Sequence, residues 1–371
     1  MNLTEVPNFR TFYRRGAIMS KNDAAIIKRL KELCKGVDQN IKKLPLNAND
    51  KYALFSDLHL GDGGKVDNFV HNEETMIFAL NYYKNNGYSI IFLGDVEEFW
   101  QFNFIKVRDR YDKNIYKLLR SFPKNKVHRI FGNHDMEWKQ NRLSDPIINN
   151  GNIPDRIPER IMLDDYIFLV HGHQGDNLCD RKASHSRIWS RSFKIFVPIA
   201  RIFGYENCSA TKSQIPKDRE KLYYNWAKDN NVILICGHTH NAIFASRSYY
   251  VWLKEKIELK KSEKKQCSTD KEKFRKLSEY INKLKKELHS EERRGRDISP
   301  LETEGVPLPC YFNTGCGLYS KGITNIEIER GKIRLIKWKS NDSLLLEKRK
   351  KELWEEESLS EIRKKINIKS V

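Results

Sequence analysis

The stretch Tyr52-Ala53-Leu54-Phe55-Ser56-Asp57-Leu58-His59 carries the pattern that decides the fold. Four largely apolar residues are followed at once by polar ones, which predicts a short buried strand that ends just before Asp57. The same pattern recurs at four later places, where the apolar runs cover residues 90–93, 127–131, 167–170 and 232–235. Buried strands of this kind have both faces covered by other parts of the chain.

Helix-like stretches separate several of these runs and lie at residues 73–86, 112–121 and 217–229. Alternation of buried strands with helices is typical of an α/β fold. Two further apolar runs near residues 323–328 and 333–338 predict additional strands in the C-terminal part. The sequence therefore predicts an α/β architecture.

Each of the five predicted strands is followed by residues that can bind a metal ion. The motifs are Asp57-Leu58-His59, Gly94-Asp95, Gly132-Asn133-His134-Asp135, His171-Gly172-His173 and Gly237-His238-Thr239-His240. Because ligands collect at the carboxyl ends of strands in α/β sheets, these motifs can converge in space. Oxygen and imidazole ligands without thiolate suit Mn, Fe or Zn. Seven candidate ligands suit two ions that share one carboxylate, and two ions about 3.5–4 Å apart can promote phosphoryl transfer.

This ordered set of motifs resembles the calcineurin-like metallophosphoesterase superfamily, whose pattern reads D-x-H, GD, GNH[DE], H and GHxH. The resemblance covers about residues 52–245 and the strands near 310–338. It implies a four-layer α/β/β/α sandwich with helical insertions. It also implies two divalent metal ions at one edge of the sandwich, with Mn expected first and Fe or Zn as alternatives.

The resemblance also implies a role for each matching residue. One ion would be held by Asp57, His59 and His240, the other by Asn133, His171 and His238, and Asp95 would bridge them. His134, paired with Asp135, would stabilise the transition state and protonate the leaving oxygen. A carboxylate partner fixes the tautomer of such an imidazole and raises its basicity, which suits that role.

The stretch Gly94–Trp100, which reads GDVEEFW, separates this chain from one branch of the superfamily. Phosphoprotein phosphatases carry GDxVDRG, whose Arg contacts phosphate, and that Arg is missing here. The pattern GD-x-x-[ED]-x-W resembles the UDP-2,3-diacylglucosamine pyrophosphatases of lipid A synthesis, and residues 209–213 resemble their N-S-S-K-S lid motif. Glu98, Trp100 and Lys212 are therefore candidate substrate-binding residues. The lipid A enzymes have GNRD and HGD where this chain has GNHD and HGH, so the lipid substrate does not follow.

These motifs favour hydrolysis of a phosphodiester or pyrophosphate bond in a nucleotide-linked or lipid-linked small substrate. A nuclease or cyclic-nucleotide phosphodiesterase is the alternative, since double-strand-break nucleases share the motif set. A non-enzymatic scaffold would require lost ligands, and all seven are present. The oligomeric state is left open by the sequence.

The chain is expected to comprise an N-terminal extension at 1–50, a catalytic domain at 51–340 and a charged C-terminal helix at 341–371. Within the catalytic domain, residues 177–230 are expected to form a basic and apolar lid, and residues 253–298 a charged helical hairpin. Arg alternates with Trp and Phe over 186–204, as in helices that lie on membrane surfaces. This stretch is therefore expected to cover the substrate or to contact a membrane.

The formal net charge of +19 arises from 68 Lys and Arg against 49 Asp and Glu. Segments 1–50, 177–226 and 254–297 carry +5, +6 and +6 of this charge, so the excess lies around the catalytic core. A phosphorylated substrate or membrane surface is the expected anionic partner, and nucleic acid is the alternative.

The start of the chain shows no apolar segment behind basic residues, and no apolar run approaches the roughly 18 residues of a membrane span. Seven Cys without paired spacings indicate reduced thiols. The protein is therefore expected in the cytoplasm, with peripheral contact to the inner membrane face through residues 186–204.

Overall fold

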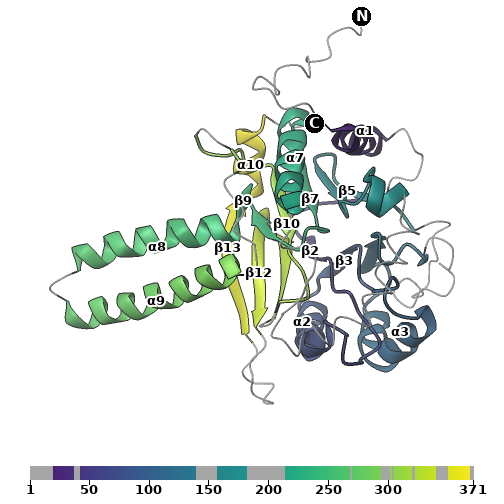
Figure 1. Cartoon of the computed structure of the whole chain (residues 1–371), viewed down its shortest axis with the longest axis horizontal. Coiled ribbons are helices and arrows are strands. Elements are labelled where there is room, and N and C mark those ends of the chain that lie inside the picture. Colours follow the sequence, from purple (N-terminus) through teal and green to yellow (C-terminus); the bar gives the residue numbers. More distant parts are fainter. Residues whose placement is uncertain are drawn as a thin grey trace, which may run out of the picture.

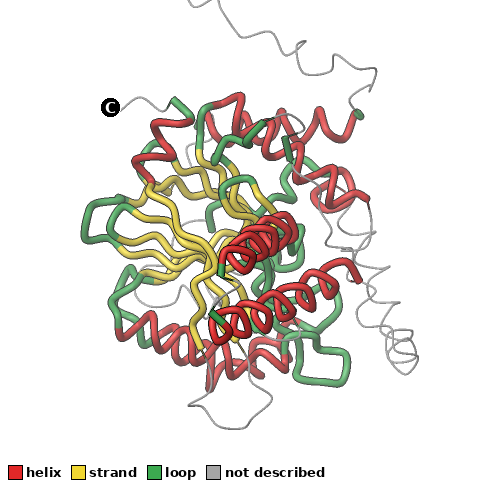
Figure 2. Tube along the Cα trace, turned by 90° about the vertical axis from the view of Figure 1, so that its left-hand side faces the viewer, coloured by secondary structure: helices red, strands yellow, loops and turns green. Residues whose placement is uncertain are grey.

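Two β-sheets face each other at the centre of the structure, with helices around them (Figures 1 and 2). The structure is a computed structural model. It describes residues 20–36, 42–138, 157–181, 214–267, 270–293, 301–302, 305–319, 322–339 and 350–367.

The six-stranded sheet has the order β13-β12-β11-β2-β3-β4. Its strands are β2 (Lys51–Phe55), β3 (Ser89–Leu93), β4 (Val127–Ile130), β11 (Ile323–Glu329), β12 (Lys332–Lys339) and β13 (Lys350–Ser358). Strands β2, β3 and β4 run parallel, while β11, β12 and β13 extend the sheet in antiparallel fashion beside β2. The parallel half of this sheet therefore ends in the first three predicted motifs.

The seven-stranded sheet has the order β1-β5-β6-β7-β10-β8-β9. Its strands are β1 (Lys42–Leu44), β5 (Arg160–Leu163), β6 (Ile167–Val170), β7 (Ile233–Cys236), β8 (Ala242–Phe244), β9 (Arg247–Ser248) and β10 (Tyr311–Thr314). Strands β6, β7 and β10 are parallel neighbours. The last two motifs follow β6 and β7, so this sheet supplies their histidines.

Alternating side chains of β2 enter two different cores, because neighbouring side chains of a strand point to opposite faces. Tyr52 and Leu54 belong to the core shared with the seven-stranded sheet, and Ala53 and Phe55 to the core on the other face of the six-stranded sheet. Both faces are covered, which explains why the strand reads as a continuous apolar run.

The helices complete the outer layers. On the six-stranded sheet pack η2 (Val70–Asn72), α2 (Glu73–Asn85), α3 (Phe104–Tyr111), η3 (Asp112–Tyr116) and α4 (Lys117–Arg120). On the seven-stranded sheet pack α1 (Lys21–Lys35) and α7 (Gln214–Asn230), with the short η5 (Asn177–Arg181) between them in sequence. This confirms the predicted four-layer α/β/β/α sandwich. No described helix is long and apolar enough to cross a membrane.

The N-terminal 50 residues contribute to the sandwich rather than lying outside it. Ile26, Leu30 and Leu33 of α1 are buried in the core of the seven-stranded sheet. Strand β1 pairs in parallel with β5 at the edge of that sheet. The expected boundary at residue 51 is therefore too late, because an amphipathic helix and a three-residue strand precede it.

The predicted lid over 177–230 is too long at its C-terminal end. Helix α7 packs against β7 and β10, and Tyr223, Tyr224 and Trp226 are buried there. Residues 182–213, which include the predicted membrane-contact stretch and Lys212, lie outside the described residues. The helix at 217–229 is thus a layer of the catalytic fold.

Helices α8 (Tyr249–Gln266) and α9 (Lys271–Arg293) form a hairpin that projects from the body where the charged hairpin is predicted (Figure 1). Leu253 and Ile257 of α8 pack against Ile281 and Leu284 of α9. Phe274, near the start of α9, is 39% exposed. The apolar seam therefore occupies the part of the hairpin nearer the body.

The predicted C-terminal helix over 341–371 is wrong for most of its described length. Residues 350–358 form strand β13 beside β12, and only α10 (Leu359–Lys365) is helical. Glu356 pairs across the strands with Lys332 and Arg334, at 2.6 Å in both cases. Cross-strand charge pairs stabilise a sheet whose residues, Lys and Glu, individually favour helices.

Candidate functional site

Five of the seven ligand candidates have a left-handed backbone conformation. Their φ angles are 52° at Asp57, 51° at His59, 51° at Asp95, 70° at His238 and 60° at His240. Positive φ is uncommon for residues other than glycine, and such strain collects at functional sites. The sharp turns occur directly after strands β2, β3 and β7, and they bring the side chains together at one edge of the two sheets.

Two glycines allow these turns to approach each other closely. A Cβ atom at Gly132 would overlap Asp95 Oδ1, and a Cβ atom at Gly237 would overlap Ser56 Oγ and Asp57 Oδ2. Only glycine fits where backbone passes this close to a ligand side chain. The Gly in the third and fifth motifs therefore has a packing role at the site.

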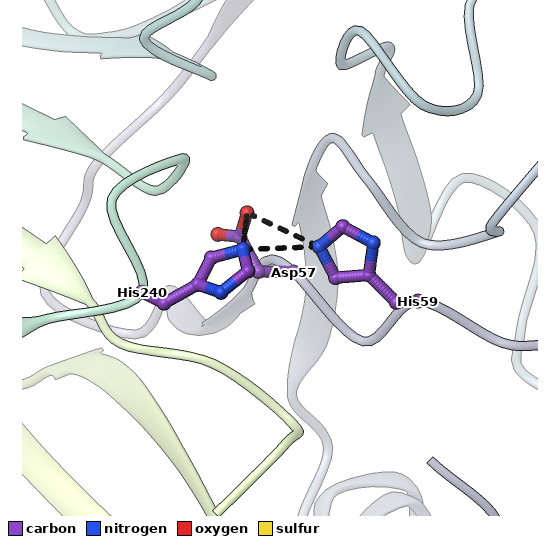
Figure 3. A group of neighbouring side chains, drawn as sticks. All are labelled: Asp57, His59 and His240. Carbon is purple, nitrogen blue, oxygen red and sulfur yellow. Dashed lines mark hydrogen bonds and ion pairs between the residues drawn. The ribbon is translucent and has the colours of Figure 1, made fainter. Parts of the chain in front are cut away.

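Asp57, His59 and His240 form the first group of candidate ligands (Figure 3). His240 Nε2 lies 3.3 Å from Asp57 Oδ1 and 3.0 Å from His59 Nε2. Asp57 Oδ1 is buried and accepts no hydrogen bond from any described residue. A buried carboxylate oxygen that accepts no hydrogen bond fits a cation, because its burial is otherwise costly.

Asp95, His171 and His238 form the second group, with Asn133 beside them. His171 Nε2 lies 3.1 Å from Asp95 Oδ2 and 3.2 Å from Asn133 Oδ1. His171 Nδ1–H donates to the carbonyl oxygen of Leu93 at 2.8 Å, which leaves Nε2 as the nitrogen that can bind a metal.

Asp95 lies between the two groups. Its Oδ2 is 3.1 Å from His171 Nε2 of the second group and 3.8 Å from His59 Nε2 of the first. The backbone N–H of His134 donates to its other oxygen, Oδ1, at 2.8 Å. The structure thus brings all seven candidate ligands together, in the grouping that the resemblance implies; their binding of metal stays a prediction.

The electrostatics of the site suit cation binding. Burial alone would raise the pKa of Asp95 and of Asp57, but the neighbouring His171 and His240, respectively, hold both pKa values well below the ordinary range. Burial lowers the pKa of His238 to about 3 and also lowers that of His240. The carboxylates are therefore ionised and the His238 imidazole is neutral, the forms in which they bind metals.

The nitrogen and oxygen donors, together with the buried Asp57 Oδ1 atom that accepts no hydrogen bond from the described residues, fit two divalent cations. Two such ions supply Lewis-acid activation of water and neutralisation of phosphate charge. Each ligand group draws on both sheets: Asp57, Asp95 and Asn133 follow strands of the six-stranded sheet, and His171 and His238 follow strands of the seven-stranded sheet.

Glu98 is the partner of His134, where the sequence predicted Asp135. Glu98 Oε1 accepts from His134 Nδ1 at 2.7 Å, and Oε2 accepts from His59 Nδ1 at 2.8 Å. Burial would raise the pKa of Glu98, but the two histidines lower it to about 2. An ionised carboxylate therefore fixes Nδ1–H on both rings, which leaves Nε2 of His134 to exchange a proton with a substrate.

Asp135 has a different role: it holds the backbone next to the candidate ligands. Its side chain accepts from the backbone N–H groups of Gly132 at 2.6 Å and Val96 at 2.8 Å, and from Arg129 Nη2 at 2.9 Å. The same Nη2 donates to Glu97 at 2.8 Å, and all three charged side chains are fully buried. Since both oxygens of Asp135 are occupied, it ties two ligand-bearing turns together and does not contact the His134 ring.

Trp100 covers the His134 ring on one face. The ring centroids are 4.1 Å apart with an interplanar angle of 25°. Trp100 is 5% exposed and Glu98 is 4% exposed. Both contact His134 in the structure, and their predicted contact with substrate stays a prediction. The sequence signal for Glu98 is its place three residues after Asp95, but the pattern does not show which histidine it contacts.

The chain is similar to one known protein family and to several solved structures. Residues 51–242 match the family described as calcineurin-like phosphoesterase. No curated protein matches the chain significantly. Among solved structures, Vacuolar Protein Sorting 29 from Cryptosporidium parvum is 11% identical, with 84% of this chain and 100% of that chain covered and a TM-score of 0.33.

A conserved uncharacterised protein from Streptococcus pneumoniae TIGR4, described as a predicted phosphoesterase, is 10% identical, with 83% and 100% covered and a TM-score of 0.26. TM-scores this low support no conclusion about the chain. The family match spans more than half of the 371 residues and contains all five motifs. The chain therefore belongs to the calcineurin-like phosphoesterase family and is a metal-dependent phosphoesterase.

Proposed function

We propose that the protein hydrolyses a phosphodiester or pyrophosphate bond in a nucleotide-linked or lipid-linked small molecule, with two Mn²⁺ ions. The observation that carries this proposal is the position of Glu98 between His59 and His134. One carboxylate links a candidate metal ligand to a candidate proton donor, and the two imidazole centroids are 4.8 Å apart. A proton donor fixed beside the metal groups suits a bond whose leaving oxygen must be protonated.

The residue at the position of the phosphate-binding Arg of the phosphoprotein phosphatases also supports the proposed substrate class. Phe99 stands in that place, is 2% exposed, and packs on Phe104 and Trp138 with centroid distances of 4.9 and 5.6 Å. This position therefore offers no charge to a phosphoprotein. The GD-x-x-E-x-W stretch favours substrates like those of the UDP-2,3-diacylglucosamine pyrophosphatases, and the excess positive charge favours an anionic substrate.

Manganese is proposed because carboxylate, amide and imidazole donors without sulfur suit Mn better than softer metals. A cytoplasmic location with peripheral membrane contact through residues 186–204 belongs to the same proposal. Its support is the Arg, Trp and Phe interleaving of that stretch, which lies outside the described residues.

The test is a substrate panel assayed on the full-length protein with Mn²⁺. The panel contains bis(p-nitrophenyl) phosphate, p-nitrophenyl phosphate, a nucleoside diphosphate sugar, a lipid-linked nucleoside diphosphate, cyclic AMP and duplex DNA. We expect the highest kcat/KM on the nucleoside diphosphate sugar and the lipid-linked nucleoside diphosphate. The Asp95→Ala and Asn133→Ala variants should have no activity. Preference for DNA or cyclic AMP would establish the alternative, and preference for the monoester would overturn the proposal.

A further inference from the structure

Helix α7 reaches two ligand-bearing loops through residues one turn apart. The Tyr223 hydroxyl donates to the carbonyl oxygen of Gly172, which directly follows His171. The Glu220 carboxylate accepts from the Thr239 hydroxyl, and Thr239 lies between His238 and His240. Glu220 and Tyr223 are 0% and 1% exposed. Residues three apart share one face of a helix, so a single face of α7 contacts both loops.

The His238 turn has a strained backbone conformation that needs support from its surroundings, and Gly172 approaches it closely. Gly172 has a φ of 117°, and His238 has a φ of 70°. A Cβ atom at Gly172 would lie 3.2 Å from His238 Cβ and 3.3 Å from Tyr223 Oη. Strained conformations persist where neighbouring contacts over-determine them. Tyr223 packs at the point where the His171 and His238 loops meet, and it supplies such a contact.

Glu220 is held from the other side by strand β10. The Tyr311 hydroxyl donates to Glu220, and Asn313 Nδ2 donates to Thr239 Oγ1 at 3.0 Å and to the Gly237 carbonyl at 2.9 Å. The 238–240 loop is therefore fixed between α7 and β10. None of these groups is a candidate metal ligand, so their contacts act on the metal centre through the loops.

We propose that Glu220 and Tyr223 of α7 are positioning residues that set the separation of the His171 and His238 imidazoles and so determine the affinity of the second metal ion. The inference rests on the two-ion centre of the proposed function. Tyr223 acts on the His171 loop, which serves only the second group. Glu220 acts on the 238–240 loop, which serves both groups. Loss of a residue that orients a ligand costs about 10–100-fold in metal affinity in other proteins.

The experiment measures bound Mn²⁺ by atomic emission after equilibrium dialysis of the full-length protein against graded free Mn²⁺. Low-temperature electron paramagnetic resonance reports how much of the bound metal is a coupled pair. For Tyr223→Phe, we expect the free Mn²⁺ that half-fills the second site to rise at least tenfold, with the first site unchanged. Tyr224→Phe is the matched control, because the Tyr224 hydroxyl contacts Glu302 and the Leu308 N–H, away from the centre.

Glu220→Gln tests the other contact. The Thr239 and Tyr311 hydroxyls donate to different oxygens of Glu220, and a glutamine side chain replaces one of these oxygens by an NH2 donor. One of the two contacts must then be lost or reversed, and both sites should weaken. This variant also decides the matter if Tyr223→Phe fails to fold. Filling of both sites as in the wild type by the variants that fold would overturn the inference. A wild-type protein that binds no Mn²⁺ pair would instead contradict the two-ion centre itself.

Discussion

Glu98 joins His59 and His134 through its two carboxylate oxygens, at 2.8 and 2.7 Å from the respective Nδ1 atoms. His59 belongs to the first group of candidate metal ligands, and His134 is the candidate proton donor. One side chain therefore sets the tautomer of both rings, and the orientation of the donor depends on that of the ligand.

Replacement of Glu98 should impair turnover more than substrate binding. Glu98→Gln keeps the size of the side chain but offers an oxygen to only one histidine and an amide N–H to the other. We expect kcat to fall about 100-fold, the lower range for loss of a positioned acid–base group. Steady-state kinetics on bis(p-nitrophenyl) phosphate with Mn²⁺ measures this, and Glu279→Gln on the projecting hairpin is the control. A kcat within twofold of the wild type would contradict the coupling.

The acid role of His134 should appear in leaving-group dependence. His134→Ala should slow hydrolysis of a phenyl phosphodiester, whose leaving group is poor, by at least tenfold more than that of a p-nitrophenyl phosphodiester, because only the poorer leaving group needs a proton in the transition state. Comparison of kcat/KM on the two substrates is the measurement. Equal losses on both would exclude proton donation and leave only electrostatic stabilisation.

The buried Arg129 should matter for stability. Arg129→Met removes the only guanidinium that the described residues place between Glu97 and Asp135, and both carboxylates then lack a buried countercharge. Breaking a buried ion pair from one side costs about 3–5 kcal/mol. The free energy of unfolding from urea titration tests this. Arg275→Met serves as the control, since Arg275 and Glu279 form an exposed pair and little change is expected.

His128 should make stability fall in mild acid. Burial, with Lys42 of the facing sheet and the nearby Lys126, lowers the pKa of His128 to about 3, below its ordinary value. The unfolded chain then binds the proton more readily, so this contribution is complete above about pH 6.5 and is lost as the pH falls toward 3.

The loss should have a slope of about 1.4 kcal/mol per pH unit between pH 6 and 4. Urea midpoints at pH 4, 5, 6 and 7 measure it, and His128→Gln should give a shallower curve because glutamine does not titrate. Parallel curves for the two proteins would show that the acid sensitivity arises elsewhere.

The strand-end motifs could be predicted because their strands are covered on both faces. Residues 52–55 and 90–93 are continuous apolar runs, and the first candidate ligand after each, Asp57 or Asp95, lies two positions beyond the run. Strand β13 could not be predicted in this way, because its Lys and Glu residues are stabilised by partners on β12 that are distant in sequence.

The partner of His134 also could not be predicted from the sequence. Asp135 is adjacent to His134 in the chain, and Glu97 and Glu98 follow Asp95, so three carboxylates could have paired with it. The turn after β4 directs Asp135 toward Arg129, away from the His134 ring. Contacts such as that of Tyr223 with Gly172 depend on how α7 packs on the sheet, so no local sequence pattern predicts them.

The division of ligands between the two sheets has a consequence for incomplete chains. Asp57, Asp95 and Asn133 are made early in synthesis, but the second ligand group lacks its last member until residue 238 and the first until residue 240. A nascent or cleaved chain that stops before residue 238 therefore possesses neither ion site in full. Fragments should be inert toward cellular phosphoesters, so activity can begin only after translation has passed this point.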